Sequence, residues 1–269
     1  MIRTLLAPNP SPMTLDGTRT FLVGRERPAV IDPGPADPSH LDALAAALDG
    51  HPPVAILLTH AHPDHADAAP ELARRTGAPV MMARGAAGPR LYDGAVRWIG
   101  ERDRVETDAG VLRVIQTPGH APEHVAFLLD ANGGEGDRAL FAGDLFMGAA
   151  DTTLVAPPEG NLTEYLRSLD RVQALNPSAI HPAHGPTIED PLPAIHRYRA
   201  HRAERIAQVE RALGAGPARP GELIDRVYGA ELHPGLRGAA EGSLRAILHH
   251  LRSTGRVRDE AGRFSLAAG

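Results

Sequence analysis

The sequence predicts a mixed α/β (α+β) fold over its first two thirds and a small helical module after it. Short apolar runs of strand length alternate with segments in which apolar residues recur at helical spacing. Histidine and aspartate follow several of the apolar runs directly. From about residue 193 the pattern changes to helices and one hairpin. We therefore predict two units, one over residues 1–192 and one over residues 193–269.

Composition limits the class of protein. The chain has 269 residues, of which 42% are apolar and 23% are charged, as in globular proteins with a buried core. Its net charge of −5 is too mild for a molecule that binds nucleic acid over its whole surface. The absence of cysteine excludes disulfides, thiolate ligands and a cysteine nucleophile. The apolar piece in "MIRTLLAPNPSPMT" is too short for a signal peptide, and no later run is long enough to span a bilayer. We therefore expect a cytoplasmic protein that does not bind a membrane.

The first unit should begin with two short strands and continue as strands and helices in turn. The run from Val54 to Leu58 is apolar throughout, which is typical of a strand covered on both faces. The earlier elements are predicted as strands 21–23 and 29–31, a helix over 39–48 with Ser39 as its N-cap, the strand 54–58, a helix from about 67 to 77, and a strand 80–82. The later elements are predicted as strands 111–115, 125–129 and 140–142, a helix over 162–175, and a strand starting at 179.

The last 73 residues carry a different charge balance. Residues 197–269 contain 13 arginines and 8 acidic residues, a net of +5, so the rest of the chain carries −10. A long helix is predicted around 193–213. "RPGELIDRVY" and "AAEGSLRAILHHLRSTG" read as two further helices, and "RVRDEAGRFSL" as a hairpin with Glu260, Ala261 and Gly262 in its turn. The order helix, helix, hairpin is typical of a small winged-helix module.

The segment "LLTHAHPDHADAAP" places three histidines and an aspartate in six positions, directly after an apolar strand. Imidazole and carboxylate are the usual Zn²⁺ ligands where thiolates are absent. His60 and His62 project to one side of an extended chain and can bind one ion. Pro63 forces a turn, which can direct Asp64 and His65 toward a neighbouring point. This loop could therefore supply two ligands to each of two ions.

Three later segments offer ligands in similar places. "QTPGH" ends in His120, "ALFAGD" ends in Asp144, and "AIHPAHG" contains His184, each just past a short apolar strand and beside a glycine. For any one of these residues, a turn or capping role is the simpler interpretation. Together with the histidine cluster, four strand ends that deliver His and Asp to one sheet edge indicate a metal site.

The motifs "THAHPDH", "TPGH", "FAGD" and "HPAHG", in this order, resemble the metallo-β-lactamase fold superfamily over roughly residues 1–190. The resemblance implies an αββα sandwich with two metal ions at one edge, zinc in the first instance, with manganese or iron as alternatives. It implies that His60, His62 and His120 bind the first ion, that Asp64, His65 and His184 bind the second, and that Asp144 bridges both.

The stretch "MTLDGTRTFLVG" and the C-terminal pattern resemble the branch that contains β-lactamase-like protein 2. Arg19 stands where that branch usually has Asn, and Ala183 where it usually has Gly. Two further polar residues lie near the expected site. His181 is interpreted as a surface residue or a hydrogen-bond partner of a ligand. Asp32 is interpreted either as a turn former or as a residue that orients a ligand.

Two metal ions that share a hydroxide predict hydrolysis at a carbonyl or phosphoryl centre, with Asp64 and Asp144 as catalytic residues. The motifs assign no substrate-binding residue. A glyoxalase-II-type thioesterase, a lactonase and an endoribonuclease on single-stranded RNA stay open, so the substrate is a small molecule, a carrier-bound acyl group or RNA. A homodimer stays open as a further partner. A DNA-binding regulatory protein is a remote alternative, because a binding module has no use for seven metal ligands.

The arginines of the tail allow two interpretations. They could line a groove for a phosphate backbone or for the phosphopantetheine of a carrier. Acidic residues such as Glu204, Glu210 and Glu241 are interleaved with them, which favours a solvated module that forms a lid or a dimer contact. The arginines concerned are Arg197, Arg199, Arg202, Arg245, Arg252, Arg256, Arg258 and Arg263.

Overall fold

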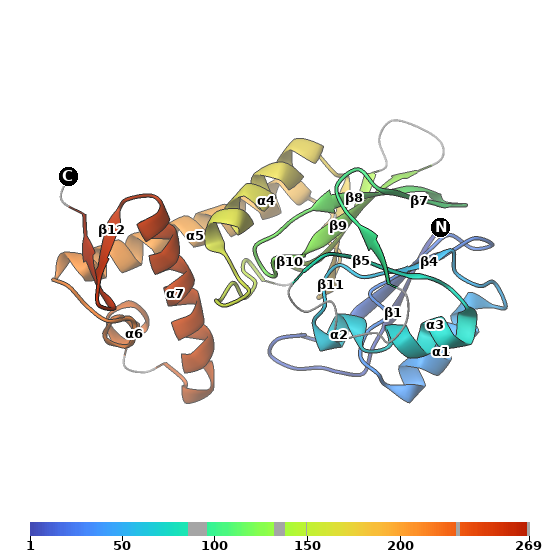
Figure 1. The fold of residues 1–269 in the computed structure, drawn as a ribbon, viewed down its shortest axis with the longest axis horizontal. Helices are drawn as coiled ribbons and strands as arrows, with labels where there is room; N and C mark the ends of the chain where they lie inside the picture. Colours follow the sequence, from blue (N-terminus) through green and yellow to red (C-terminus); the bar gives the residue numbers. More distant parts are fainter. Residues whose placement is uncertain (86–95, 132–137, 149, 230–231, 268–269) are drawn as a thin grey trace.

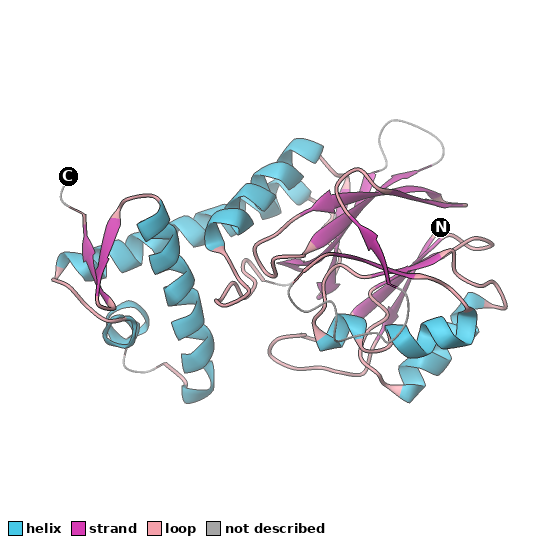
Figure 2. Cartoon of the chain, in the orientation of Figure 1, coloured by secondary structure: helices cyan, strands magenta, loops and turns pink. Residues whose placement is uncertain are grey.

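The computed structural model describes residues 1–85, 96–131, 138–148, 150–229 and 232–267. Two β-sheets face each other, with helices on their outer sides (Figure 1, Figure 2). The first sheet has the order β1 (Ile2–Leu6), β2 (Arg19–Val23), β3 (Ala29–Ile31), β4 (Ala55–Leu57), β5 (Val80–Ala83), β6 (Val96–Ile99). The second has the order β11 (Ala179–His184), β10 (Arg138–Met147), β9 (Val125–Ala131), β8 (Gly110–Gln116), β7 (Arg104–Thr107).

The side chains of each sheet alternate between the sandwich core and the outer helices, as the period of a strand requires. Ile31 of β3 packs against residues of the second sheet such as Phe127, while its neighbour Val30 packs against the helices. The first sheet is covered by α1 (Pro38–Leu48) and α3 (Ala69–Thr76), and the second by α4 (Leu162–Leu175) and the N-terminal half of α5 (Pro191–Gly214). This αββα arrangement confirms the predicted fold class.

Several predicted boundaries are corrected by the structure. Helix α1 begins at Pro38, and its N-cap is Asp37 rather than Ser39, because the Asp37 carboxylate accepts a hydrogen bond from the backbone N–H of His40 at 2.9 Å. The helix predicted over 67–77 is α3, which spans 69–76, and a separate short helix that was not predicted, α2 (Pro63–Ala66), precedes it. Strands β1, β6 and β7 were not predicted, because arginine interrupts the apolar pattern of β1 and β6, and β7 has only one apolar residue.

The C-terminal module consists of α6 (Pro220–Tyr228), a 3₁₀ turn (Pro234–Leu236), α7 (Arg237–Ser253) and the hairpin β12 (Val257–Glu260) with β13 (Arg263–Leu266). The hairpin turn is narrower than predicted, since Glu260 already pairs with Arg263 and only Ala261 and Gly262 connect them. No helix among the described residues combines the length and the apolar character needed to cross a membrane.

Helix α5 connects the sandwich to the module (Figure 1). Its buried residues recur at helical spacing along its whole length, from Ala194 and Tyr198 to Val209 and Leu213. One hydrophobic cluster runs from the outer face of the second sheet through α4 and α5 into α6 and α7. The predicted division after residue 192 therefore falls at the start of a helix whose single apolar stripe packs against both the sandwich and the module. The division into two units stays a prediction.

Candidate metal centre

The histidine loop begins where β4 ends, at the carboxyl end of the first sheet. Strands β3 and β4 are parallel, so the residues that follow them lie at the same edge. Asp32 follows β3 and Thr59 follows β4 by one further residue. His60 and His62 lie in the loop before α2, where His62 is extended, and His65 lies in α2 itself. The predicted turn at Pro63 is thus the first turn of a short helix.

The other candidate ligands come from the second sheet and its loops. His184 is the last residue of β11, and Asp144 lies inside β10, at a place where its pairing with β11 is irregular. Gly143 adopts a left-handed conformation there, and a Cβ atom on it would lie 2.6 Å from Thr59 Oγ1. Only glycine allows this approach of the two sheets, which directs the Asp144 carboxylate toward the histidine loop.

The first group comprises His60, His62, His120 and Asp144. Nδ1 of His62 lies 2.9 Å from Nε2 of His60 and 3.0 Å from Nε2 of His120. Nε2 of His120 lies 3.4 Å from Oδ2 of Asp144. Two nitrogens bound to one tetrahedral Zn²⁺ at about 2.0–2.1 Å would lie about 3.3 Å apart. The spacing of these atoms therefore suits one ion.

The second group comprises Asp64, His65 and His184. Oδ2 of Asp64 lies 3.5 Å from Nε2 of His65 and 3.2 Å from Nε2 of His184. The same two nitrogens lie 3.2 and 3.1 Å from Oδ1 of Asp144. One oxygen of the Asp144 carboxylate thus faces each group, which is the geometry of a bridging carboxylate.

Each of the five histidines has a hydrogen-bond acceptor or partner on its outward nitrogen. Such partners fix the tautomer and orientation of metal-bound imidazoles. Nδ1 of His65 lies 2.9 Å from Asp32 Oδ2, and Nδ1 of His120 lies 2.8 Å from the Leu154 carbonyl. The remaining pairs are His60 Nδ1 with Thr59 Oγ1 at 3.0 Å, His62 Nε2 with Glu159 Oε2 at 2.8 Å, and His184 Nδ1 with the Gly17 carbonyl at 3.3 Å.

Asp32 connects the loop to the sheet edge. Its carboxylate accepts hydrogen bonds from the Thr59 backbone N–H at 2.8 Å, from the Thr59 hydroxyl at 2.7 Å and from His65 Nδ1 at 2.9 Å. The residue is buried and has a left-handed backbone, with φ of 47°. Of the two interpretations made from the sequence, these contacts favour the one in which Asp32 orients a ligand.

The seven residues fit a metal ion chemically. With their outward nitrogens engaged by acceptors, the histidines present unprotonated nitrogens to the centre of each group. His65 Nε2 and Asp144 Oδ1 are buried polar atoms without a hydrogen-bond partner among the described residues. Leaving such atoms unpaired is costly, and a cation between them removes the cost. Imidazole and carboxylate together suit zinc, iron or manganese.

The electrostatics of the second group also favour a bound cation. Burial disfavours a charged imidazole, but the Asp144 and Asp32 carboxylates outweigh it and raise the pKa of His65 well above its usual range. Burial likewise opposes the charge on His184, yet the nearby Asp144 and Asp64 carboxylates raise its pKa to about 9. Burial would raise the pKa of Asp144, but His65 and His184 hold it well below the usual value. These carboxylates attract positive charge to the group, which a divalent cation would supply.

His181 lies apart from the two groups. Its ring stacks on Phe141, with centroids 5.2 Å apart, and its Nδ1 lies 3.1 Å from the Thr187 hydroxyl. The expectation that it supports a ligand finds no such contact among the described residues. Its side chain packs at the sandwich edge instead, as an aromatic residue would.

Sequence reasoning missed His124, Glu123 and Glu159. His124 is buried, accepts a hydrogen bond from the Asp144 backbone N–H at 3.2 Å, and burial lowers its pKa to about 3. Glu123 accepts from the Ala61 N–H at 3.3 Å. The segment "PGHAPEH" carries a second histidine four residues after His120, which was the available signal for His124. Glu159 had none, because it meets His62 across 97 positions of sequence.

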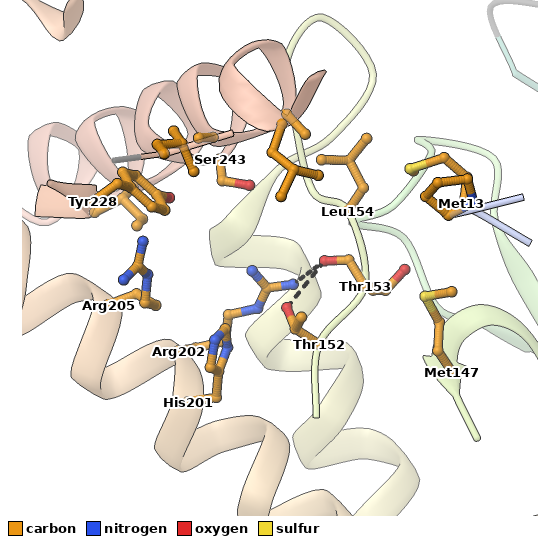
Figure 3. Close-up of a pocket in the computed structure, with 16 residues that line it drawn as sticks. Met13, Met147, Thr152, Thr153, Leu154, His201, Arg202, Arg205, Tyr228 and Ser243 are labelled. Carbon is orange, nitrogen blue, oxygen red and sulfur yellow. Dashed lines mark hydrogen bonds between the residues drawn. The ribbon is translucent and has the colours of Figure 1, made fainter. Parts of the chain in front are cut away.

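A cavity of about 440 Å³ lies between the C-terminal module and the segment that follows β10 (Figure 3). That segment includes Leu154, whose carbonyl oxygen holds His120. Arg202 of α5 is buried and donates a hydrogen bond to the carbonyl of Thr153, and its guanidinium lies 4.9 Å from the ring centre of Tyr165. The same short segment therefore contacts both α5 and the candidate metal centre.

Comparison with known proteins identifies the family. Residues 13–184 match the family model of the metallo-beta-lactamase superfamily, and residues 220–264 match that of the beta-lactamase associated winged helix domain. The chain belongs to the metallo-β-lactamase superfamily and carries the winged-helix domain associated with it. It is a hydrolase of that superfamily, with a His/Asp cluster suited to a metal.

Three curated relatives align with more than nine tenths of this chain. The lactamase-like protein aptB of Emericella nidulans is 31% identical over 96% of this chain and 83% of its own length. The beta-lactamase-like protein 2 homolog of Drosophila melanogaster is 29% identical over 94% and 88%. The atrochrysone carboxyl ACP thioesterase dmxR1 of Cryptosporiopsis is 28% identical over 95% and 81%.

Solved structures share the fold. A beta-lactamase domain protein from Burkholderia ambifaria superimposes with a TM-score of 0.85, at 24% identity, over 99% of this chain and 91% of that protein. The protein TTHA1623 in a di-iron-bound form has a TM-score of 0.54 at 30% identity, over 70% of this chain and 94% of its own. The first of these covers both units of the chain, and the second covers a smaller part.

Proposed function

We propose that this protein is a dinuclear metal-dependent hydrolase that cleaves acyl thioesters. The observation that carries the dinuclear assignment is the Asp144 carboxylate, whose two oxygens lie within 3.4 Å of histidines from the two separate groups. His60, His62 and His120 would hold one ion, and Asp64, His65 and His184 the other. Zinc is the metal expected from the ligand types, and iron is the alternative, since TTHA1623 has a di-iron-bound form.

Bound ions would lower the pKa of a shared water and polarise the carbonyl of the substrate. The protein's own part is to hold the ligands rigidly and to place a carboxylate beside the water. Asp64 suits this role, because its side chain is 29% exposed while its Oδ2 faces the second group. Asp32 and Glu159 fix the rings of His65 and His62 through the nitrogens that face away from the ions, so the ligands are held in place before a substrate binds.

The choice of thioesters rests on relatives and on charge. Two relatives that span most of this chain are named as ACP thioesterases, at 28% identity. Recognition of RNA would need a basic groove. In this structure Arg197, Arg199, Arg245, Arg252, Arg256 and Arg263 each pair with an acidic residue. Paired arginines favour the interpretation of the module as a packed unit rather than a polyanion groove.

A hydrolysis panel on the full chain tests this proposal. The protein is loaded in turn with zinc, iron and manganese, and assayed on acyl-pantetheine thioesters, a lactone, an aryl phosphodiester and single-stranded RNA. We expect the wild type to cleave the thioesters. Asp64→Asn should reduce this cleavage by about 100-fold without a change in thermal stability. Cleavage of RNA or the phosphodiester alone, with no turnover of thioesters, would refute the substrate class.

A further inference from the structure

The cavity beside the module has two chemically different ends (Figure 3). Met13 and Met147 line one end, and Leu154 lies between the ends. Arg205 and Tyr228 line the other, where the Arg205 guanidinium stacks 4.0 Å from the ring centre of Tyr228. A volume of about 440 Å³ falls within the usual range for small-molecule sites. The cavity can hold an elongated molecule that is apolar along its length and polar at one tip.

The apolar end lies on the chain segments that carry the candidate metal centre. Met147 is three residues beyond Asp144 in β10. Leu154 contributes its side chain to the cavity and its carbonyl oxygen to His120, at 2.8 Å from Nδ1. A substrate whose carbonyl carbon is at the metal centre would therefore extend past these side chains toward α5.

The far end is cationic. The Arg205 guanidinium lines it beside Tyr228, Arg202 follows toward Thr153, and the described lining residues include no aspartate or glutamate. Arg202 is 4% exposed, and its Nε is a buried donor without a hydrogen-bond partner among the described residues. Nδ1 of His201 is another buried nitrogen without a partner among those residues, and burial lowers the pKa of this ring, so it adds no charge. A buried donor such as Arg202 Nε requires an acceptor, and the two guanidinium groups favour an acidic one.

We propose that this cavity binds the acyl group of the substrate, and that the preferred acyl group carries an acidic group at its far end. The proposal rests on the thioesterase function and adds the site that selects the acyl chain. The thioester would lie at the metal centre, the chain would pass Met147 and Leu154, and the distal carboxylate or phenol would meet Arg205. The module would then supply one wall of the acyl site, through α7 and Tyr228.

Kinetics on three thioesters of N-acetylcysteamine test the proposal: acetyl, octanoyl, and the monothioester of octanedioic acid. Ser243 of α7 lines the cavity, and Ser243→Phe would fill it. This variant should raise KM for the octanoyl substrate, relative to the acetyl substrate, by about tenfold. Arg205→Met should raise KM for the octanedioyl substrate by about tenfold and leave that for the octanoyl substrate within about twofold.

Arg245→Phe is the matched control for Ser243→Phe. It places the same ring on α7, at an exposed position that does not line the cavity and whose ion pair is with Glu241 of the same helix. Its KM values should equal those of the wild type. If the ratio of the octanoyl KM to the acetyl KM is the same in the wild type and in Ser243→Phe, and thioesters are still hydrolysed, the cavity assignment is overturned. The thioesterase function would then be left intact.

Binding of the free acid distinguishes a wrong reaction from a wrong binding site. Calorimetric titration of octanedioate into the full chain needs no turnover. The wild type should bind it, and both Ser243→Phe and Arg205→Met should weaken binding by about tenfold or more. If these shifts occur while no thioester is hydrolysed, the proposed reaction is wrong and the acidic-chain site stands. If octanedioate does not bind the wild type, the site is wrong.

Discussion

Replacement of Asp32 by asparagine should weaken metal binding without removing any ligand. The carboxylate uses both oxygens, with Oδ1 accepting from the Thr59 N–H and Oδ2 from the Thr59 hydroxyl and His65 Nδ1. An amide offers one oxygen, so in either orientation its NH₂ faces a buried donor. The left-handed backbone at this position is one that asparagine tolerates, so the change tests the side chain alone.

The size of the effect on stability and on metal affinity follows from these contacts. A buried donor left without an acceptor costs about 1–3 kcal/mol, which should appear as a loss of unfolding free energy. The neutral amide also withdraws the negative charge that supports His65, and changes of this kind lower metal affinity by about 10–100-fold. The weakened site should be the second one, since His65 belongs to the group with Asp64 and His184.

Competition with a chelator, followed by elemental analysis, measures the effect. The second ion should be lost from Asp32→Asn at a chelator concentration about tenfold or more below that needed for the wild type. Asp37→Asn is the matched control, because asparagine caps a helix as well as aspartate and the residue lies outside the site. Identical chelator profiles for Asp32→Asn and the wild type would refute the orienting role of Asp32.

Three further predictions concern the fold. Leu248→Ala, at a fully buried position of α7 in the shared cluster, should cost about 2–5 kcal/mol in denaturant titration, while exposed Arg245→Ala should change stability by less than about 0.5 kcal/mol. Asn161→Ala removes the cap that accepts from the Thr163 and Glu164 N–H groups, and should cost about 1 kcal/mol where Asn161→Asp costs little. Hydrogen bonds from Arg74 and Arg75 lower the pKa of Glu71 from 4.5 to about 2, so its stabilising effect is complete above 4.5 and is lost as pH falls toward 2. Glu71→Gln should flatten the stability profile in that window, and a profile unchanged by the variant would contradict the ion pair.

The sequence predicted which residues meet in the candidate site better than it predicted their surroundings. His60 to His65, His120, Asp144 and His184 could be found because each follows an apolar strand, and parallel strands end at one edge. The structure brings all of these side chains together. Their outward partners could not be found, because two are backbone carbonyls, at Leu154 and Gly17, which carry no sequence signal.

The cavity and the role of the module could not be predicted either, because both depend on packing between residues far apart in the sequence. The "PARPGELIDRVY" segment predicts a helix, but nothing in it shows that Tyr228 meets Arg205 across the junction. The acidic residues interleaved with Arg favoured a solvated module over a polyanion groove, and in the structure several of these arginines pair with acids, as in Arg245–Glu241, Arg252–Asp259 and Arg256–Glu210. Because one hydrophobic cluster includes the module and the sandwich, deletion of residues 215–269 would damage the core as well as the junction. Point substitutions in the cavity are therefore the sharper test.

The most direct test of the dinuclear site is the metal content of purified protein, measured as ions per chain in the wild type, His184→Ala and Asp144→Ala. Two ions should bind the wild type, His184→Ala should lose mainly one, and Asp144→Ala should weaken both, because Asp144 alone among the seven residues has an oxygen toward each group. A wild type that binds no transition metal after reconstitution, or an Asp144→Ala variant that keeps two ions with unchanged affinity, would contradict the account.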